Sequence, residues 1–581
     1  MCGIFALLNR KQTLSLNTAE RGFEKGRNRG PEYSVLKEMG GHVLFGFHRL
    51  AINGMDTISN QPISVQNVHL ICNGEIYNFK HLYEQLGITP STHSDCEVII
   101  HLYIRYGMAQ TLAMLDGVFA FVLFDERHHK VYVARDPFGV RPLYAMVPSH
   151  ICAQNQYAFS SELKMLTDLK QALDEPNFPT CNIMPFLPGR FQEMVFDKYQ
   201  WTLLTPLSIY HRLPFSCVQT TTEQSLAEIY KGVQYYFKEA IKKRYFNTDR
   251  PIACLLSGGL DSSSVVASIN ELHKQTTAQP LETYSIGLLG SEDLRNARIV
   301  ADYLGTKHTE VILQEGDFFR AIEDTIYNIE SFDTTTVRAS IPNSELCKHI
   351  SKVSDAKVIF NGDGADELFG GYIYEYKAPD AYAFDADIRR LLDNIYKHDV
   401  RRSDGSISSH GLEPRTPFLD RALVQYVMSI SPEIRFHVQN GKCEKYLFRN
   451  AFSREHCVNA EGNQLLPDCI LWRTKEAFSD GVSSSKERSL FTVLQEQITE
   501  HLNKTSTKEE RRKKMATYTH LAPKTDEQYY YRTLFDKLFP GCDQVVTDFW
   551  MPRFVQTDDP SARTLALYNV VGASQEETTK K

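Results

Sequence analysis

The chain has 581 residues, which suits two or three separately packed domains, since a single domain commonly runs about 100–200 residues. Its 42% hydrophobic and 23% charged residues are ordinary for a globular protein, and its net charge of −7 argues against general binding to nucleic acid or anionic membranes. The sequence has no apolar run of the ~18–20 residues that a membrane helix needs, no secretory signal and no CxxC spacing among its 12 cysteines, so we expect a cytoplasmic protein with reduced thiols.

The N-terminal third predicts a strand-rich domain. Runs rich in β-branched and aromatic residues, broken by Gly, Asn and Asp, indicate strands at residues 42–47, 68–72, 118–125 and 131–134. One helix is expected among them. Ser94 and Glu97 have the spacing of a capping box, in which each side chain bonds the backbone of the other residue. Apolar residues then recur at helical spacing, at Val98, Ile99, Leu102 and Tyr103.

From about residue 224 the pattern changes to alternating strands and helices. Buried strands are predicted at residues 252–256, 281–286 and 356–360, and a helix at residues 293–304 that ends at Gly305. Such alternation is typical of an α/β domain with a parallel sheet, whose ligands bind at the carboxyl ends of the strands. The fold class expected for the whole chain is therefore α+β followed by α/β.

The boundary between the two domains is expected within residues 206–222, where periodicity is weak and Thr, Ser and Pro are frequent. We assign residues 1–209 to the first domain and 210–572 to the second, and predict a disordered polar tail at 573–581. The mixed-charge run at 508–514 is interpreted as a solvated helix face rather than a nucleic-acid site, and His128-His129 as a solvated turn.

Cys2 is the first candidate catalytic residue. If the initiator methionine is removed, Cys2 carries a free α-amine with an ordinary pKa near ~8, which can accept the proton of its own thiol. Nucleophile and base then belong to one residue, which is a known way to activate such a group. Taken alone, the position also fits a chance cysteine at a frayed chain end.

Five ordered motifs decide between these readings: Cys2-Gly3-Ile4-Phe5, Arg29-Gly30-Pro31, His48-Arg49-Leu50-Ala51-Ile52, Asn73-Gly74-Glu75-Ile76-Tyr77-Asn78 and Ser94-Asp95-Cys96-Glu97. Together they resemble the class II glutamine amidotransferase domain, an N-terminal-nucleophile hydrolase. The resemblance implies an αββα sandwich that hydrolyses glutamine at Cys2. The motifs also show one departure, because Glu32 stands where the family usually has Asp, and we expect this to change loop packing only.

The resemblance also implies a role for each polar residue of these motifs. The Asn73 side chain and the Gly74 N–H would stabilise the tetrahedral oxyanion. Arg49 would hold the α-carboxylate of glutamine through paired hydrogen bonds. Glu75 and Asp95 would hold its α-ammonium group.

A glycine-rich loop, Leu255-Leu256-Ser257-Gly258-Gly259-Leu260-Asp261-Ser262-Ser263, follows a predicted strand and opens a helix. Glycines let the backbone wrap an anion, and a helix N-terminus offers unpaired N–H groups. The loop lacks the Lys-Ser ending of a Walker A motif and resembles the pyrophosphate loop of N-type ATP pyrophosphatases, whose parallel-sheet domain is HUP-like. The resemblance implies ATP contacts at the loop residues from Leu255 to Ser263 other than Leu256, and at Ile286, Asn361 and Gly362.

A second acidic cluster lies in the glycine-rich run 361–372, directly after the strand predicted at 356–360. Magnesium prefers a few carboxylates together with phosphate oxygens, so Asp366 could share Mg²⁺ with Asp261 across the pyrophosphate of ATP. The alternative is an acidic turn without metal. Nothing implies an organic prosthetic group, and no His/Cys cluster has zinc spacing.

The two domains in this order resemble the asparagine synthetase family, and segments 333–340, 413–420, 444–445 and 472–481 match that family further along the chain. The family's reaction joins aspartate to MgATP, giving a β-aspartyl-adenylate, which ammonia released from glutamine then attacks. The resemblance gives Lys445 the task of offsetting charge on the phosphates and places Arg338 near the synthetase pocket without a defined contact. By analogy it also implies a homodimer.

The run at 361–372 departs from the family at one candidate catalytic residue. Asp363 stands where the family has the glutamate that accepts a proton from ammonia, and its stem is shorter by ~1.5 Å. Either the backbone compensates, which we favour, or the acceptor pocket is altered. Three rival functions stay open: a related ligase acting on another carboxylate, a glutaminase with an inactive synthetase domain, and a non-catalytic glutamine or nucleotide sensor.

Overall fold

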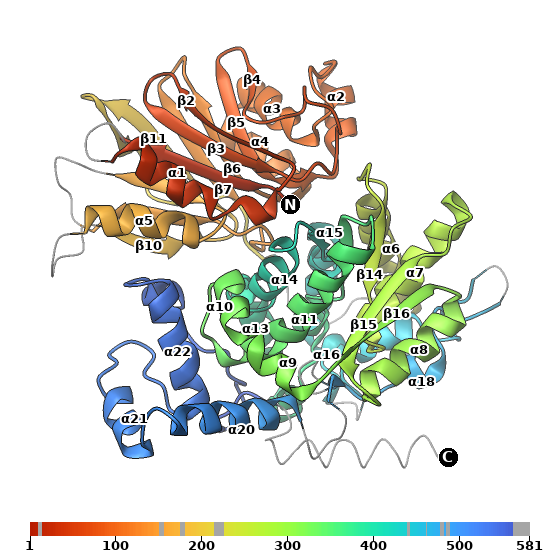
Figure 1. The fold of residues 1–581 in the computed structure, drawn as a ribbon. Helices are drawn as coiled ribbons and strands as arrows, with labels where there is room; N and C mark the ends of the chain where they lie inside the picture. Colours follow the sequence, from red (N-terminus) through yellow and green to blue (C-terminus); the bar gives the residue numbers. More distant parts are fainter. Residues whose placement is uncertain are drawn as a thin grey trace.

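The N-terminal and C-terminal parts of the chain pack against each other as two layered bodies (Figure 1). The structure is a computed structural model. It describes residues 1–9, 14–149, 156–174, 181–213, 226–438, 442–459, 462–476, 481–483 and 489–561. The predicted tail at 573–581 lies outside the described residues.

Two antiparallel sheets form the N-terminal domain. The first has the order β10 (Cys181–Pro185), β8 (Tyr144–Pro148), β9 (Tyr157–Ser160), β1 (Gly3–Leu8), β3 (Val43–Arg49) and β2 (Tyr33–Met39). The second has the order β12 (Gln200–Leu203), β11 (Arg190–Asp197), β7 (Lys130–Arg135), β6 (Gly117–Asp125), β5 (Val68–Ile76) and β4 (Ile63–Val65), with β13 (Ser208–Ile209) paired to β11. These strands include all four predicted from the sequence.

Helices cover the outer face of each sheet. Helices α1 (Leu16–Glu24) and α5 (Lys164–Leu173) pack on the first sheet, while α2 (Phe79–Leu86), α3 (Val98–Tyr106) and α4 (Met108–Met114) pack on the second. Strand β1 shows why the layers form. Ile4, Ala6 and Leu8 face the second sheet, whereas Phe5 and Leu7 face the helices, as the period of two in a strand requires. This is the αββα sandwich that the sequence predicts.

The C-terminal domain is built on one parallel sheet. Its order is β16 (Lys307–Leu313), β15 (Glu282–Leu288), β14 (Ile252–Leu255), β17 (Val358–Phe360) and β18 (Glu413–Arg415), and every neighbouring pair is parallel. The chain winds outward from β14 to β16 and then returns to the other side of β14. Strands β14 and β17 therefore flank the topological switch point, where ligands bind in open α/β sheets.

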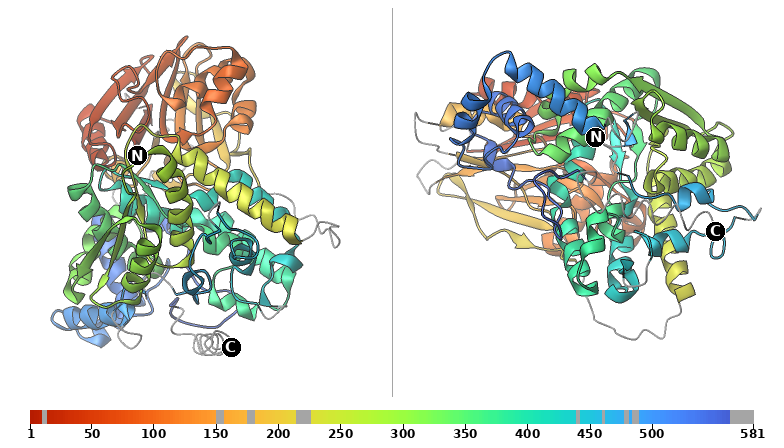
Figure 2. Two further views of the ribbon diagram at one scale, coloured as in Figure 1. Left: turned by 90° about the vertical axis from the view of Figure 1, so that its right-hand side faces the viewer. Right: turned by 90° about the horizontal axis from the view of Figure 1, so that it is seen from below.

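Helices cover both faces of the parallel sheet, with Cys254 facing one layer and Ala253 the other (Figure 2). The described helices of the C-terminal domain are, in chain order, α6 (Leu226–Tyr245), α7 (Leu260–Thr276), α8 (Glu292–Leu304), α9 (Glu315–Arg320), α10 (Ile322–Ile329), α11 (Thr334–Val353), α12 (Ala365–Phe369), α13 (Ala381–Asn394), α14 (Asp399–Ser408), α15 (Arg421–Ser429), α16 (Pro432–Arg435), α17 (Tyr446–Ala451), α18 (Asp468–Leu471), α20 (Leu490–Asn503), α21 (Lys508–Met515) and α22 (Asp526–Leu538). Short 3-10 helices occur at Arg27–Arg29, Asp95–Glu97, Ile373–Lys377, Ile395–Lys397, Pro417–Leu419 and Asp543–Val545.

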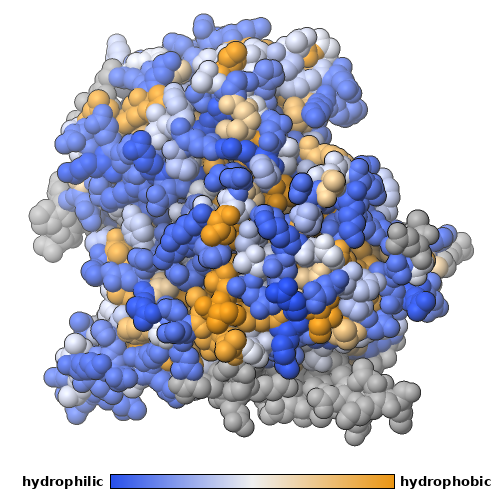
Figure 3. All heavy atoms as spheres, turned by 45° about the vertical axis from the view of Figure 1, so that its right-hand side comes forward, coloured by the Kyte–Doolittle hydropathy of each residue, from blue (hydrophilic) through white to orange (hydrophobic). Residues whose placement is uncertain are grey.

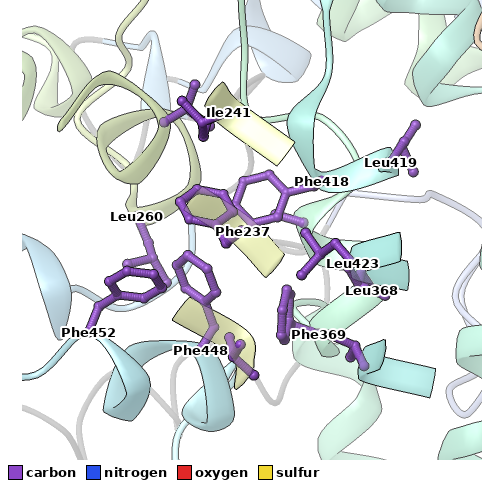
Figure 4. Packing of buried hydrophobic residues seen from close by; sticks show 14 of the residues in the cluster. Phe237, Ile241, Leu260, Leu368, Phe369, Phe418, Leu419, Leu423, Phe448 and Phe452 are labelled. Carbon is purple, nitrogen blue, oxygen red and sulfur yellow. The ribbon is translucent and has the colours of Figure 1, made fainter. Parts of the chain in front are cut away.

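Aromatic rings dominate the core on the α6 side of this sheet. Figure 4 shows Phe237 of α6 surrounded by Phe418, Phe448 and Phe452, and the three ring centroids lie 4.9–5.5 Å from that of Phe237. On the face seen in Figure 3 most of the surface is hydrophilic, with a hydrophobic strip near the middle. No described helix is both long enough and apolar enough to cross a membrane.

Two local predictions need correction. The capping box at Ser94 and Glu97 is wrong: Ser94 Oγ accepts from the Cys96 N–H, but Glu97 instead accepts from the N–H groups of Ser91 and Thr92. The helix consequently begins at Val98, after a 3-10 turn. The run at 508–514 does form a helix, α21, but Arg511 is buried and pairs with Asp526 at 2.9 Å. The predicted domain boundary falls between β13 and α6, partly outside the described residues.

Replacing Phe237 by Ala should destabilise the C-terminal domain by about 3–5 kcal/mol, because a fully buried ring is lost from a close-packed aromatic cluster. Equilibrium urea unfolding of the purified protein measures the change. Tyr235→Ala is the matched control on the same helix, since Tyr235 is 61% exposed, and it should cost less than about 1 kcal/mol. Equal effects of the two substitutions would contradict this account of the core.

Candidate active sites

Cys2 lies at the start of β1, at the edge of the core between the two N-terminal sheets. Pairing of Gly3 with His48 on β3 brings Cys2 beside Leu50, whose carbonyl accepts from the thiol at 3.7 Å. Arg29 Nε donates to the Cys2 carbonyl at 3.1 Å. Burial raises the pKa of the Cys2 thiol, which the neighbouring N-terminal amine opposes. The thiol therefore needs a base to become a nucleophile at neutral pH.

The α-amine next to Cys2 belongs to Met1 in the full-length chain. Met1 is buried, and its nitrogen lies 4.0 Å from Glu413 Oε2 on β18 of the other domain. Burial lowers the pKa of this amine to about 6. Removal of Met1 would turn the backbone nitrogen of Cys2 into a free α-amine, as the use of the Cys2 amine as a base requires.

Asn73 and Gly74 lie on β5, across the sheet interface from β1. The Asn73 side chain is fully buried, and within the described part of the chain neither its amide nitrogen nor its amide oxygen has a hydrogen-bond partner. An orphaned buried amide of this kind is costly without a ligand and is ready to donate to an oxyanion. A side chain at Gly74 would crowd the Val118 carbonyl and Phe119 on β6, so glycine is required there by packing.

Glu75 and Asp95 are two buried carboxylates near each other. Burial raises the pKa of both carboxyl groups, that of Asp95 to about 6. The negative charges of Glu413 and Asp95 raise the pKa of Glu75 further. Such a pair favours a bound cation, as an α-ammonium group would be. The Glu75 carboxylate, however, accepts from Asn247 at 3.0 Å and lies 3.5 Å from Arg415, both residues of the C-terminal domain. Asp95 accepts from the Ile76 N–H at 2.6 Å.

Arg49 is buried at the end of β3, and its guanidinium organises the loop that follows. It donates to the Asp56 carbonyl at 2.7 Å, to Asn60 Oδ1 at 2.6 Å and to the Gly54 carbonyl. Binding of a glutamine carboxylate by Arg49 would therefore be coupled to the position of this loop.

Glu32 does more than the loop packing predicted from the sequence. It accepts from the Ala51 N–H at 2.7 Å and pairs with Arg250 of the C-terminal domain.

The second site is a cavity of about 240 Å³ at the switch point between β14 and β17. The glycine-rich loop after β14 and the acidic run after β17 both line it. The two segments touch, because a Cβ at Gly362 would lie 2.7 Å from the Ser262 nitrogen. Helix α7 begins at Leu260 with no side chain capping its first N–H groups, so they are available to an anion.

Two carboxylates and two lysines meet in this cavity. Lys445 Nζ lies 2.6 Å from both oxygens of Asp261 and 2.5 Å from Asp366 Oδ1, and Lys475 Nζ lies 2.6 Å from Asp366 Oδ2. Burial by itself would raise the pKa of Asp366, but the ammonium groups of Lys445 and Lys475 hold that pKa below its ordinary value. Lys445 has a left-handed backbone, with φ of 56°, which is a strained conformation typical of functional positions.

Comparison with known proteins gives the family. Residues 1–187 match the model of the glutamine amidotransferase domain, and residues 232–390 and 380–559 match that of asparagine synthase. This chain belongs to the asparagine synthase family. It is 40% identical to the asparagine synthetase [glutamine-hydrolyzing] of Gallus gallus and 38% identical to that of Homo sapiens, each over 98% of this chain and 99% of the relative. Glutamine phosphoribosylpyrophosphate amidotransferase from B. subtilis is a weaker structural match, with a TM-score of 0.29, 17% identity, and coverage of 53% of this chain and 81% of that one.

Asp363, the departure from the family glutamate, is held by a helix of the same domain. Arg402 of α14 lies 2.5 Å from Asp363 Oδ1 and 2.9 Å from Asp399. Burial raises the pKa of Asp363, and Arg402 opposes that rise. Next to it, Asn361 donates to Ser403 Oγ at 2.6 Å. The shortened carboxylate is thus fixed by α14, and whether its position serves the same proton transfer stays a prediction.

The structure places most of the predicted nucleotide contacts in the cavity, but not all. The predicted residues that line the cavity are Leu255, Ser257, Gly259, Leu260, Asp261, Ser262, Ile286, Asn361 and Gly362. Gly258 and Ser263 do not: Gly258 has φ of 71° and packs against α8, while Ser263 is fully buried. Sequence reasoning missed Lys475 and Arg402. Lys475 falls in the segment 472–481 that matches the family, whereas nothing in the sequence around Arg402 marked it.

Gly371→Ala should weaken ATP binding at least about tenfold, since an added methyl group would overlap Asp366 Oδ1 and Lys445 Cε and push the carboxylate–lysine pair apart. Isothermal titration with ATP measures the affinity. Gly316→Ala is the matched control, because its methyl group would meet only the flexible end of Arg320. Unchanged affinity in Gly371→Ala would exclude this pair from the nucleotide site.

Proposed function

We propose that this chain is a glutamine-dependent asparagine synthetase, which converts aspartate, ATP and glutamine into asparagine, AMP, pyrophosphate and glutamate. The observation that carries the proposal is the meeting of Asp261, Asp366, Lys445 and Lys475 at the switch point, in one cavity with Asp363. Full-length relatedness to enzymes named asparagine synthetase [glutamine-hydrolyzing] supports it. The intact Cys2 site favours this function over a nucleotide sensor.

Ammonia is released in the first half-reaction. Cys2, activated by its own α-amine after loss of Met1, attacks the amide carbon of glutamine. The C–N bond then breaks, ammonia leaves with the proton from the thiol, and water hydrolyses the resulting glutamyl thioester to glutamate and free Cys2. The negative charge that develops on the amide oxygen is stabilised by the unpaired Asn73 amide and the Gly74 N–H. The buried carboxylate of Asp95, with Glu75 beside it, favours the α-ammonium group of free glutamine. Arg49 would donate hydrogen bonds to the α-carboxylate in place of one of its contacts to the loop.

Aspartate is activated in the second half-reaction. Its side-chain carboxylate attacks the α-phosphorus of ATP, pyrophosphate leaves, and a β-aspartyl-adenylate forms. The pyrophosphate moiety fits the uncapped N-terminus of α7 and the ammonium groups of Lys445 and Lys475. Ammonia then attacks the acyl carbon, AMP leaves, and Asp363 accepts the proton that the nitrogen loses.

Asp261 and Asp366 fit a Mg²⁺ ion that arrives with ATP. They already converge on one cation, Lys445 Nζ. Among the described residues no group of three or more His, Cys, Asp or Glu side chains could hold a metal ion, so phosphate oxygens would have to complete the ligand set. When bound, Mg²⁺ would neutralise charge on the phosphates. Protein carboxylates together with phosphate oxygens match its ligand preference.

The cellular setting and assembly belong to the same proposal. The ten described cysteines are all free, as expected of a cytoplasmic enzyme. The family implies a homodimer, which light scattering of the purified protein would test.

Product analysis with ¹⁵N-labelled glutamine tests the function. Purified protein with aspartate, MgATP and amide-labelled glutamine should form labelled asparagine in a one-to-one ratio with AMP and pyrophosphate, measured by mass spectrometry. Cys2→Ala should lose this reaction and keep synthesis from added ammonium chloride, while Cys469→Ala, an exposed cysteine, should behave as wild type. Formation of labelled ammonia without asparagine or AMP would show that aspartate is not the substrate and that the protein acts as a glutaminase.

The KM for glutamine should rise as pH falls below about 6. Burial holds the pKa of Asp95 near that value, so the carboxylate is charged above it and neutral below it. Only the charged form attracts the α-ammonium group, and KM should increase up to about tenfold per pH unit well below the pKa. Glutamine hydrolysis followed between pH 5 and 8 gives KM separately from kcat. Asp95→Asn should show a high KM that no longer depends on pH, and a flat wild-type KM would contradict the role of Asp95.

A further inference from the structure

The described chain after the 3-10 helix Asp543–Val545 has no helix or strand, and it is partly buried against the C-terminal domain. This segment, residues 546–561, follows α22 and runs back across the domain as the dark-blue coil in the right view of Figure 2. We call it the C-terminal strap. Trp550, Pro560 and Ser561 of the strap line the same cavity as Asp261 and Asp363. The strap thus supplies part of the wall of the synthetase pocket.

Trp550 separates this pocket from a neighbouring cleft, because it lines both. Its ring packs on Tyr372 and Tyr374, with centroid distances of 5.1 and 6.1 Å. The backbone N–H of Trp550 donates to Asp333 Oδ1 at 2.8 Å. The other oxygen of Asp333 caps α11 through the Thr336 N–H at 2.8 Å, so one buried carboxylate fixes both the helix start and the strap.

The far end of the strap is anchored by Arg338 of α11. Its guanidinium donates to both oxygens of Asp559, at 3.0 and 2.8 Å, and to both oxygens of Glu527 on α22, at 2.8 and 2.6 Å. Arg338 is almost fully buried, so this double fork is shielded from solvent and directional. This geometry also gives Arg338 contacts that the sequence could not define: it lines the pocket and holds the end of the strap through Asp559.

A third anchor lies just before Trp550, near the start of the strap. Asp548 of the strap lies 3.4 Å from His398 Nε2 and 2.7 Å from Lys397 Nζ. Three sets of charged contacts and one aromatic cluster therefore hold a segment that has no helix or strand of its own. Such an arrangement is expected where a segment must stay in place over a cavity.

We propose that the C-terminal strap, seated by the Arg338–Asp559 pair and by Trp550, closes the synthetase pocket and keeps water away from the activated aspartate. The proposal rests on the proposed function, because only an acyl-adenylate makes water a competitor. Arg338, Asp559 and Trp550 are positioning residues in this scheme. They act by excluding solvent and touch no reacting atom.

The reaction to be prevented is hydrolysis of the intermediate. Water in place of ammonia forms a C–O bond to the acyl carbon, the bond from that carbon to the phosphate oxygen breaks, and AMP leaves with the electron pair. The proton from water goes to solvent. Aspartate is regenerated, and one ATP is converted to AMP and pyrophosphate without asparagine. A loosened strap therefore predicts wasted ATP.

The test compares Asp559→Asn with Asp558→Asn in the full-length protein. Asp558 is the neighbouring residue and is 91% exposed; its one ion pair within the described residues is a 3.9 Å contact to Lys524. Each variant receives aspartate, MgATP and ammonium chloride in H₂¹⁸O, and AMP, asparagine and ¹⁸O in recovered aspartate are measured. Wild type and Asp558→Asn should form AMP and asparagine in a one-to-one ratio. Asp559→Asn should raise that ratio roughly twofold or more and place ¹⁸O in the side-chain carboxylate of aspartate.

Trp550→Ala provides the second variant and should show the same leak. Glutamine hydrolysis at Cys2, measured without ATP, should stay at the wild-type level in all three variants and shows that each is folded. An unchanged AMP-to-asparagine ratio without ¹⁸O in aspartate, in both Asp559→Asn and Trp550→Ala, would overturn the strap proposal alone. If wild type forms neither AMP nor asparagine, the proposed function fails instead.

Discussion

The synthetase half of this protein depends on the contact between two backbone segments at the switch point of its parallel sheet. The loop after β14 and the run after β17 approach so closely that a Cβ at Gly362 would lie 2.7 Å from the Ser262 nitrogen. Only because glycine occupies this position can Asp261 of α7 and Asp366 of α12, which follow different strands, reach the same cation. The order of the strands brings the two segments together, and the lack of a side chain at Gly362 lets their backbones come into contact.

Electrostatics then determine what this meeting point can bind. Two carboxylates drawn into a partly closed cavity would repel each other, and Lys445 and Lys475 offset their charge. The left-handed backbone of Lys445 shows that the surrounding structure fixes the backbone of this residue. An incoming polyphosphate would bring the opposite charge and compete with the carboxylates for the same lysines. These ion pairs therefore hold the two ammonium groups in advance at the place where the phosphate charge would bind.

Sequence reasoning recovered what is local and missed several contacts between residues that are distant along the chain. The strands, the glycine-rich loop, Cys2, Asn73 and the acidic run could each be read from a few neighbouring residues, and the structure places them at two sites. By contrast, Lys475 reaches Asp366 across 109 positions and Arg402 reaches Asp363 across 39. The direction of the Glu75 side chain depends on Asn247 and Arg415, which belong to the other domain. No local pattern of residue types could specify such partners, because their approach is decided by packing of whole elements.

One turn of α14 illustrates how packing joins the two sites. Asp404 on this turn forms a buried, two-pronged ion pair with Arg29, whose Nε holds the Cys2 carbonyl. Its neighbours Arg402 and Ser403 hold Asp363 and Asn361 in the synthetase cavity. A buried ion pair contributes little net stability, but it disfavours any other register of the two domains, since a shift would leave a charge unpaired in the interior. The backbone of α14 therefore fixes the position of the nucleophile's carbonyl and of the synthetase carboxylate with respect to each other.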